Sequence, residues 1–157
     1  MRRAPEHAED EALARALRAG GHRVTAPRLL VGRALRERGG HSTAEQIHRD
    51  VDGSLGATSL PTVYAALNLL VELGLARRVH AGDGPTLYDP RAEPHHHRVC
   101  TSCGRIEDID ADVDLGAVLD VAGRDGFAPA TTDVVVTGRC AACAATAAEL
   151  IAACAPS

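Results

Sequence analysis

Two Cys-x-x-Cys pairs are the clearest chemical signal in this sequence. Cys100 and Cys103 form the first pair, Cys140 and Cys143 form the second, and residues 104–139 separate them. The two sulfurs of one such turn can bind the same ion, and two turns supply the four thiolates of a tetrahedral zinc site. A redox-active dithiol is the alternative, but it requires only one pair. The four cysteines therefore predict a closed, structural Zn²⁺ site.

A run of three histidines, His95-His96-His97, leads directly into the first cysteine pair. In a strand, His95 and His97 would project from one face and His96 from the other. Asp89 precedes the run and Asp108 follows the first cysteine turn, so both carboxylates could join the imidazoles. Nitrogen and oxygen donors of this kind suit Fe²⁺, Mn²⁺ or Zn²⁺. The sequence thus predicts a second, more exchangeable metal site.

Each donor of this second site also has an ordinary structural interpretation. The His-x-His pair could lie on the surface, Asp89 could be a turn residue, and His41, a further candidate donor, could be a solvated histidine before a helix. The hypothesis depends on their combination. An ion bound by groups from two parts of the chain would fix the angle between those parts, and metal occupancy would then control shape.

The composition fits a metal-stabilised protein of modest size. The 157 residues suffice for one domain or two small ones, and they include one Phe, two Tyr and no Trp. A zinc site would compensate for the missing aromatic packing.

No apolar run approaches the ~18 residues of a membrane span, and acidic residues follow the first arginines where a signal peptide would be apolar. We expect a soluble, cytoplasmic protein with reduced thiols, in which Cys154 is a spare thiol.

The net charge of −4, taken alone, argues against a nucleic-acid partner. Its distribution is uneven, however. Residues 1–89 hold 12 basic and 11 acidic side chains for a net +1, whereas residues 90–157 hold 5 and 10 for a net −5. This imbalance would let the N-terminal part face phosphates while the remainder stays away from them.

Residues 1–89 predict a winged helix-turn-helix domain. Apolar periodicity and cap signals predict helices over residues 11–18, 25–39, 42–51 and 59–73. The third of these opens on Ser42-Thr43-Ala44-Glu45, which has the pattern of a capping box. Two short strands over residues 75–79 and 86–88, joined by a turn at 81–84, predict the hairpin of the wing.

Residues 90–94 contain two prolines and predict a hinge before a second domain over residues 95–157. Short strands are expected at residues 98–99, 105–109 and 133–137, with helices at about 112–124 and 144–153. The fold class is therefore α+β, and the cysteine pairs would tie the first two strands of the second domain to its last strand.

Taken together, these residues resemble the ferric uptake regulator superfamily of bacterial metal-dependent repressors. The match runs from about Leu17 to Cys143 and rests on five motifs in a specific order: RVTAPR at 23–28, HSTAEQI at 41–47, TVY at 62–64, HHHRVCTSCG at 95–104 and GRCAAC at 138–143. The resemblance implies a homodimer whose winged helix binds a palindromic operator and whose C-terminal α/β domain dimerises and holds the four-cysteine zinc site. It implies no enzyme activity, no membrane partner and no small ligand besides metal ions and peroxide.

The resemblance also implies a role for each metal donor. Structural zinc would be bound by Cys100, Cys103, Cys140 and Cys143, and the regulatory ion by His41, Asp89, His95, His97 and Asp108. That ion would be Fe²⁺ or Mn²⁺, and Zn²⁺ could replace it in vitro. The extra metal site of some members is not expected, because Pro129-Ala130-Thr131-Thr132 contains no histidine, which would leave His96 without a partner.

Two acidic positions favour the peroxide-sensing branch of that superfamily. Asp89 stands where zinc sensors commonly have cysteine, and Asp108 stands where peroxide sensors typically have Asp and iron sensors Glu. Fe²⁺ in such a site would leave a position open to peroxide, with His41 and His95 as targets of oxidation, whereas Mn²⁺ would support repression without reacting. The alternative is an iron-responsive, or zinc- or nickel-responsive, repressor of metal uptake genes.

The second helix of a helix-turn-helix enters the major groove, and this predicts the DNA contacts. Ser59, Thr62 and Tyr64 are the candidate base contacts, and Arg23, Arg28, Arg77 and Arg78 are the candidate phosphate contacts. These arginines could instead form a solvated face, and Ala65 departs from the Arg of many relatives, which leaves operator preference open.

Two other classes of function explain less of the chain. A zinc hydrolase would need a general base, and the sequence has no His-Glu-x-x-His motif. A zinc-ribbon interaction module would account for the cysteines but not for the capped helices and the wing.

Overall fold

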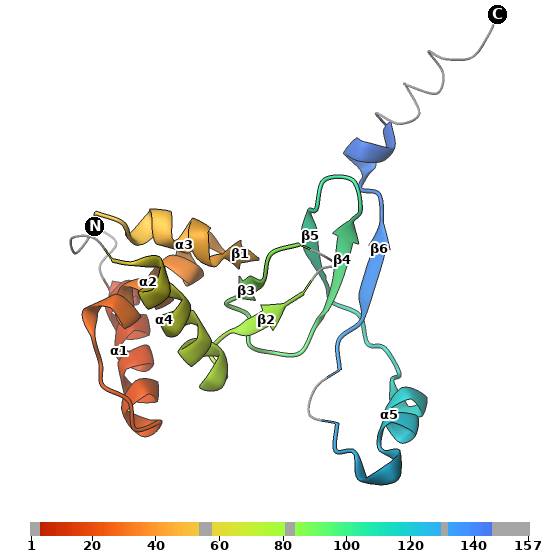
Figure 1. Cartoon of the computed structure of the whole chain (residues 1–157), viewed down its shortest axis with the longest axis horizontal. Coiled ribbons are helices and arrows are strands. Elements are labelled where there is room, and N and C mark those ends of the chain that lie inside the picture. The colour runs from red at the N-terminus through yellow and green to blue at the C-terminus, as the bar shows by residue number, and fades with distance from the viewer. Residues whose placement is uncertain (1–3, 54–57, 81–83, 130–131, 146–157) are drawn as a thin grey trace, which may run out of the picture. The chain divides into compact units, whose positions relative to one another are not determined.

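The computed structural model describes residues 4–53, 58–80, 84–129 and 132–145, and the chain divides into two compact units, Met1–Ala92 and Glu93–Ser157 (Figure 1). Parts of the predicted wing turn and of the 129–132 segment, most of the predicted C-terminal helix, and Cys154 lie outside the described residues. The hinge at 90–94 stays a prediction. Within the part of the chain that is described, no helix has the length and apolarity to cross a membrane.

The first unit contains four helices and a small sheet. Its elements are α1 (Ala4–Ala19), α2 (Ala26–Arg38), β1 (Ser42–Thr43), α3 (Ala44–Val51), α4 (Leu60–Glu72), β2 (Arg77–Val79) and β3 (Leu87–Asp89). The core forms among the four helices, with Leu17, Val31, Ile47, Val63 and Leu67 completely buried. Burial of each aliphatic side chain contributes about 1.5–3 kcal/mol. This is the predicted winged helix-turn-helix.

The helix boundaries of the first unit follow the predicted signals, with two corrections. Helix α1 begins at Ala4, seven residues before the predicted start at residue 11. Ser59 caps α4 by accepting a hydrogen bond from the Thr62 amide, and Gly39 ends α2 with a φ of 61° that favours glycine. The capping box of α3, however, is Thr43 with Gln46, not Ser42 with Glu45. Ser42 instead belongs to β1, where its side chain is buried and accepts a hydrogen bond from Arg38.

The wing contains a third strand, β1, where a helix was expected. β3 lies between β1 and β2 and is antiparallel to both. Ser42 pairs with Tyr88, so the residue before β1 and the residue at the end of β3 become neighbours. These two residues are His41 and Asp89.

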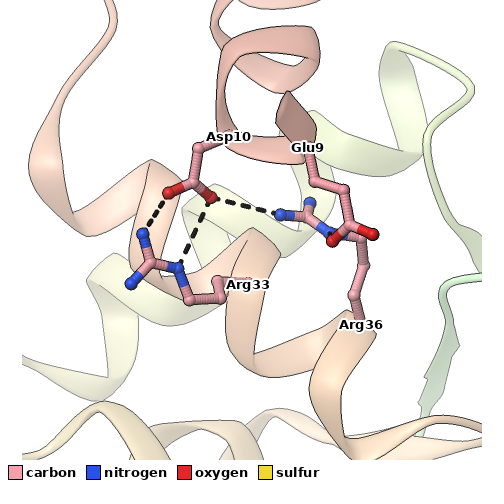
Figure 2. A network of polar contacts seen from close by, with 4 residues as sticks. All are labelled: Glu9, Asp10, Arg33 and Arg36. Atoms are coloured by element: carbon pink, nitrogen blue, oxygen red, sulfur yellow. Dashed lines mark hydrogen bonds and ion pairs between the residues drawn. The ribbon is translucent and has the colours of Figure 1, made fainter. Parts of the chain in front are cut away.

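A charged network joins α1 to α2 (Figure 2). Asp10 accepts hydrogen bonds from Arg33 and from Arg36, whose Nη2 atom lies 3.3 Å from Oδ1. Glu9 adds a contact of 3.3 Å to Nε of Arg36. The side chain of Asp10 is 15% exposed and that of Glu9 is 58% exposed, so the Asp10 contacts are the less screened by solvent.

The second unit contains a three-stranded sheet with one crossover connection. β4 (His96–Cys100) lies between β5 (Ile106–Ile109), which is antiparallel to it, and β6 (Val135–Gly138), which is parallel (Figure 1). Helix α5 (Gly116–Ala122) and a 3₁₀ turn (Arg124–Gly126) lie in the crossover.

Helix α5 is shorter than the predicted 112–124. The Asp114 carboxylate accepts a hydrogen bond from the Gly116 amide, and this turn delays the start of the helix. Residues 141–145 are helical and begin earlier than predicted.

The second unit buries few of its apolar side chains. Among its described residues, only His95, His97 and Cys100 are buried. Val118, Val121, Phe127 and Val136 are each more than half exposed. An unaided hydrophobic core therefore cannot account for the stability of this unit.

Candidate metal centres and nucleic-acid interface

The four predicted zinc ligands lie together in the second unit. Cys100 ends β4, Cys103 lies in the following turn, and Cys140 and Cys143 lie just beyond β6. The parallel pairing of Cys100 with Gly138 brings the two Cys-x-x-Cys turns side by side. All four sulfurs lie within 4.8 Å of one another, which fits a zinc site with four cysteine ligands.

Backbone amides around the first cysteine favour its thiolate form. Hydrogen bonds from the amides of Cys140, Cys103 and Ser102 lower the pKa of Cys100 to about 6. Hydrogen bonds with the side chains of Cys140, Cys103 and Cys100 raise the pKa of Cys143 to about 12. Ionisation of Cys143 beside the other sulfurs is therefore unfavourable, and a divalent cation would supply the charge that favours its thiolate.

The remaining metal donors form two groups, one in each unit. In the first unit, Nε2 of His41 lies 3.5 Å from Oδ2 of Asp89. The other carboxylate oxygen of Asp89 accepts a hydrogen bond of 2.8 Å from the Arg91 amide, which orients Oδ2 toward the histidine. Pairing of β1 with β3 positions both residues.

In the second unit, His95, His97 and Asp108 lie together. The rings of His95 and His97 have centroids 4.6 Å apart, as expected for alternate residues on one face of a strand. Asp108 pairs with His97 across β4 and β5, and its Oδ1 lies 3.5 Å from Nε2 of His95. One donor atom from each residue lies within 4.8 Å of the other two.

The histidine hydrogen bonds define which nitrogen could bind a metal. Nδ1 of His95 lies 2.8 Å from the Glu93 carbonyl oxygen, which only accepts, so Nδ1 carries a proton and in the neutral ring Nε2 holds a lone pair. A lone pair facing the Asp108 carboxylate at 3.5 Å is stabilised by a cation between them. This arrangement of nitrogen and oxygen donors without sulfur fits a borderline divalent ion.

His96 has a partner, contrary to the prediction. Its Nδ1 atom accepts a hydrogen bond of 3.3 Å from the amide of Val134. The ring therefore ties the start of β4 to the segment before β6. No additional metal is needed to explain this residue.

The candidate DNA contacts gather on the first unit. A broad hollow of about 800 Å³ is lined by residues from the start of α2 and the start of α4, including Arg23, Arg28 and Thr62. Arg28 donates a hydrogen bond of 2.6 Å to the Arg23 carbonyl and so orders the segment before α2. Ser59 and Thr62 share a contact of 2.9 Å at the N-terminus of α4, where helix amides favour an anion.

Two further residues, Glu45 and Asn68, contact the predicted DNA-binding side chains. The Tyr64 hydroxyl donates a hydrogen bond of 2.7 Å to Glu45 of α3. Asn68 of α4 accepts hydrogen bonds from Arg78 of β2 and from Tyr88 of β3, which joins the wing to the second helix of the motif. No sequence motif points to these contacts of Glu45 and Asn68, because their partners are distant in sequence. Arg77 is half-buried in β2.

The chain is similar to a known family of regulators and to several of its members. Residues 19–137 match the Ferric uptake regulator family. Ferric uptake regulation protein 1 of Mycolicibacterium fortuitum is 39% identical over 112 residues, which are 71% of this chain and 69% of that protein. Transcriptional regulator FurA of Mycobacterium tuberculosis (strain ATCC 25618 / H37Rv) is 33% identical over 140 residues, 88% of this chain and 90% of the relative. The peroxide-responsive repressor PerR of Staphylococcus aureus (strain USA300) is 30% identical over 104 residues, 66% and 70% of the two chains.

A solved structure shows the same fold. The ferric uptake regulator Fur of Helicobacter pylori superposes with a TM-score of 0.70 at 23% identity, over 88% of this chain and 93% of that chain. That protein is described as having three functional metal-binding sites.

Proposed function

This chain belongs to the ferric uptake regulator family, and from that premise we propose that it is a repressor that senses peroxide through an exchangeable Fe²⁺ or Mn²⁺ site. Members of the family are metal-dependent transcriptional regulators, not enzymes; they bind operator DNA and act as dimers, and this chain is such a regulator. The cytoplasm, where the operator is, would be its place of action.

The proposed regulatory site joins the two donor groups around one ion. Its ligands would be His41, Asp89, His95, His97 and Asp108. The observation that carries this proposal is that each group holds a histidine nitrogen 3.5 Å from a carboxylate oxygen, a geometry that a shared cation stabilises. Because the groups come from either side of residues 90–94, one ion would couple metal occupancy to the DNA-binding unit.

Metal stoichiometry distinguishes one shared site from two separate ones. We expect zinc-loaded protein to bind one Mn²⁺ per chain, and His41→Ala and His95→Ala to lose that same equivalent, each with at least ~10-fold weaker binding. His7→Ala, at an exposed position of α1, is the matched control and should bind as wild type. Two equivalents in wild type, with one lost in each variant, would contradict a shared site.

The thiolate cluster would hold zinc permanently and play no part in sensing. Four sulfurs leave no position for another ligand, whereas the second site uses nitrogen and oxygen donors only. Chelation should therefore remove Mn²⁺ before zinc. A mobility shift on operator DNA should then disappear in chelator while zinc content stays constant, and it should return with Mn²⁺. A shift that is indifferent to this treatment would refute metal-dependent repression.

Peroxide sensing is supported by the donor set. Asp89 supplies a carboxylate where zinc sensors commonly have cysteine, Asp108 is the residue typical of peroxide sensors, and the ring of His95 is adjacent to Asp108. Bound iron would supply the redox chemistry. In the net reaction one oxygen of hydrogen peroxide ends on a ring carbon of His41 or His95, and the other leaves as water.

Mass spectrometry tests this assignment. We expect Fe²⁺-loaded protein to gain one oxygen atom on His41 or His95 after peroxide and to release its operator, while Mn²⁺-loaded protein gains none. Unmodified histidines in the iron-loaded protein would refute peroxide sensing. That outcome, combined with iron-dependent DNA binding, would favour the second candidate, an iron-responsive repressor. The names of the mycobacterial relatives support this candidate.

A further inference from the structure

The contact between Tyr64 and Glu45 lies on the side chains proposed to meet DNA. Tyr64 is in the second turn of α4 and is 36% exposed, and its hydroxyl donates to a carboxylate oxygen of Glu45 at 2.7 Å. Glu45 is exposed in the first turn of α3. The bond therefore joins the two helices of the helix-turn-helix at their solvent-facing surface.

Glu45 is itself held in place by its own helix. The Thr43 side chain accepts from the Gln46 amide at 3.2 Å, and the Gln46 side chain accepts from the Thr43 amide at 2.8 Å. These reciprocal bonds fix the first turn of α3, and the helix dipole favours a negative charge there. A carboxylate on this turn is thus a rigid acceptor.

The bond determines what Tyr64 can offer to DNA. Because its hydroxyl proton is directed at Glu45, Tyr64 has no donor left for a base edge or a phosphate. The residue stays 36% exposed, and an apolar ring in the major groove would suit the methyl group of thymine. A ring without this tether would rotate among rotamers and lose part of that contact.

An acidic side chain is unfavourable on a surface that binds DNA. Glu45 repels phosphates, so the first unit would bind nucleic acid more tightly without its charge. A role in orienting Tyr64 offsets that cost in affinity by a gain in sequence discrimination.

We propose that Glu45 is a positioning residue for operator recognition, which holds the Tyr64 ring so that it contacts a thymine methyl. The inference rests on the proposed function, since it presumes that α4 enters the major groove. It adds that discrimination at one base pair of each half-site depends on a residue of α3.

The test begins with a duplex selected from a random pool by the full-length, Zn²⁺- and Mn²⁺-loaded wild-type protein. Each thymine is then replaced by deoxyuracil, which removes only the methyl group. We expect one position per half-site at which this replacement weakens wild-type binding roughly three- to fivefold. Glu45→Gln keeps an acceptor for the hydroxyl and should retain this penalty, with tighter binding overall.

Glu45→Ala and Tyr64→Phe each remove the tether and should reduce the penalty to less than about twofold. Glu37→Ala, which removes an exposed acid from α2, is the matched control for charge and should keep the full penalty. Thermal unfolding of each variant checks that the domain is intact.

The outcomes separate this inference from the proposed function. If wild type selects no sequence, DNA recognition itself fails. If wild type selects a sequence but shows no uracil-sensitive position, or if Glu45→Ala and Tyr64→Phe keep the wild-type penalty, the role of Glu45 is refuted while the repressor stands.

Discussion

The two tyrosines differ in environment, although both donate a hydrogen bond. The Tyr64 hydroxyl meets the charged Glu45, and this hydrogen bond raises the pKa of Tyr64 and lowers the pKa of Glu45. Tyr88 is buried and donates to Asn68, and burial is the main cause that raises the pKa of Tyr88. The side chain with the exposed ring thus depends on a partner for its orientation, whereas the other is fixed by packing.

These pKa shifts define the pH range of the Glu45–Tyr64 contact. Glu45 has a lowered pKa, so the stability that the contact adds is present above the ordinary glutamate pKa and is lost as pH falls through the folded value. Tyr64 has a raised pKa, so the contribution is also lost as pH rises through its folded value. At neutral pH the carboxylate of Glu45 is therefore charged and the hydroxyl of Tyr64 is protonated, as the hydrogen bond requires.

An alkaline titration can observe this contact directly. The sequence has two tyrosines and no tryptophan, so tyrosinate absorbance in a Tyr88→Phe variant reports Tyr64 alone. We expect its midpoint to lie above that of a free tyrosine. Adding Glu45→Gln should lower the midpoint, because the carboxylate charge no longer opposes ionisation, and adding Glu37→Gln should not change it. Equal midpoints for all three proteins would show that the contact is absent in solution.

Residue types and spacing predicted which possible donor side chains lie together, but not the hydrogen-bond contacts of other side chains. Cysteine, histidine and aspartate limit the chemistry to metal binding, and β alternation correctly predicted that His95 and His97 share a face. Glu45 could not be identified in this way. It meets Tyr64 across 19 positions only after α3 and α4 pack, and no local pattern encodes that contact.

At the scale of elements, long periodic segments were predicted well and short ones were not. Helices α2 and α4 begin and end close to their predicted positions, because apolar spacing, proline and glycine agree there. Strand β1 has two residues, too few to show alternation, and exists because β3 offers it hydrogen bonds. Its formation places Ser42 in the sheet and makes Thr43 the cap of α3.

The attachment of α1 gives a prediction about stability. Asp10→Asn should lower the free energy of unfolding of the first unit by about 1–2 kcal/mol, because the negative charge and one of the two acceptor oxygens are lost at a partly buried site. Glu9→Gln is the matched control on the same helix and should change stability by less than about 0.5 kcal/mol, since its side chain is largely exposed. Urea denaturation of the zinc-loaded protein measures both. Equal changes in the free energy of unfolding would mean that the Asp10 contacts in Figure 2 stabilise the fold no more than the exposed Glu9 contact does.

The cysteine turns should determine the stability of the second unit. Cys140→Ser removes one of the four sulfurs, and we expect loss of zinc and proteolysis within residues 93–145 while the first unit keeps its helices. Structural zinc contributes on the order of 10–16 kcal/mol of apparent binding energy, and few apolar side chains of this unit are buried. Metal analysis and limited proteolysis measure the effect. Cys154→Ser is the control and should keep its zinc; if it loses zinc, the assignment of Cys154 as a spare thiol is wrong.

At the scale of the whole molecule, charge and apolar surface have different distributions. Residues 90–157 carry a net charge of −5, which disfavours contact with DNA. Yet among the residues of the second unit that the structure describes, four large apolar side chains are more than half exposed. An apolar surface on an acidic unit is suited to another protein surface. In a family that acts as dimers, a second copy of this chain is the partner that fits.

Helix α5 provides the test of this dimer surface. Val118 and Val121 are one turn apart and 56% and 58% exposed, so they form one apolar face. The double variant Val118→Asp with Val121→Asp should be monomeric at micromolar concentration, because two charges would be desolvated at the interface. Its affinity for a palindromic operator should fall at least ~10-fold, because each half-site would then be bound without the other. Asp120→Asn lies on the same helix and should stay dimeric. Sedimentation measures the oligomer; a dimeric double variant with full operator affinity would show that α5 lies outside the interface.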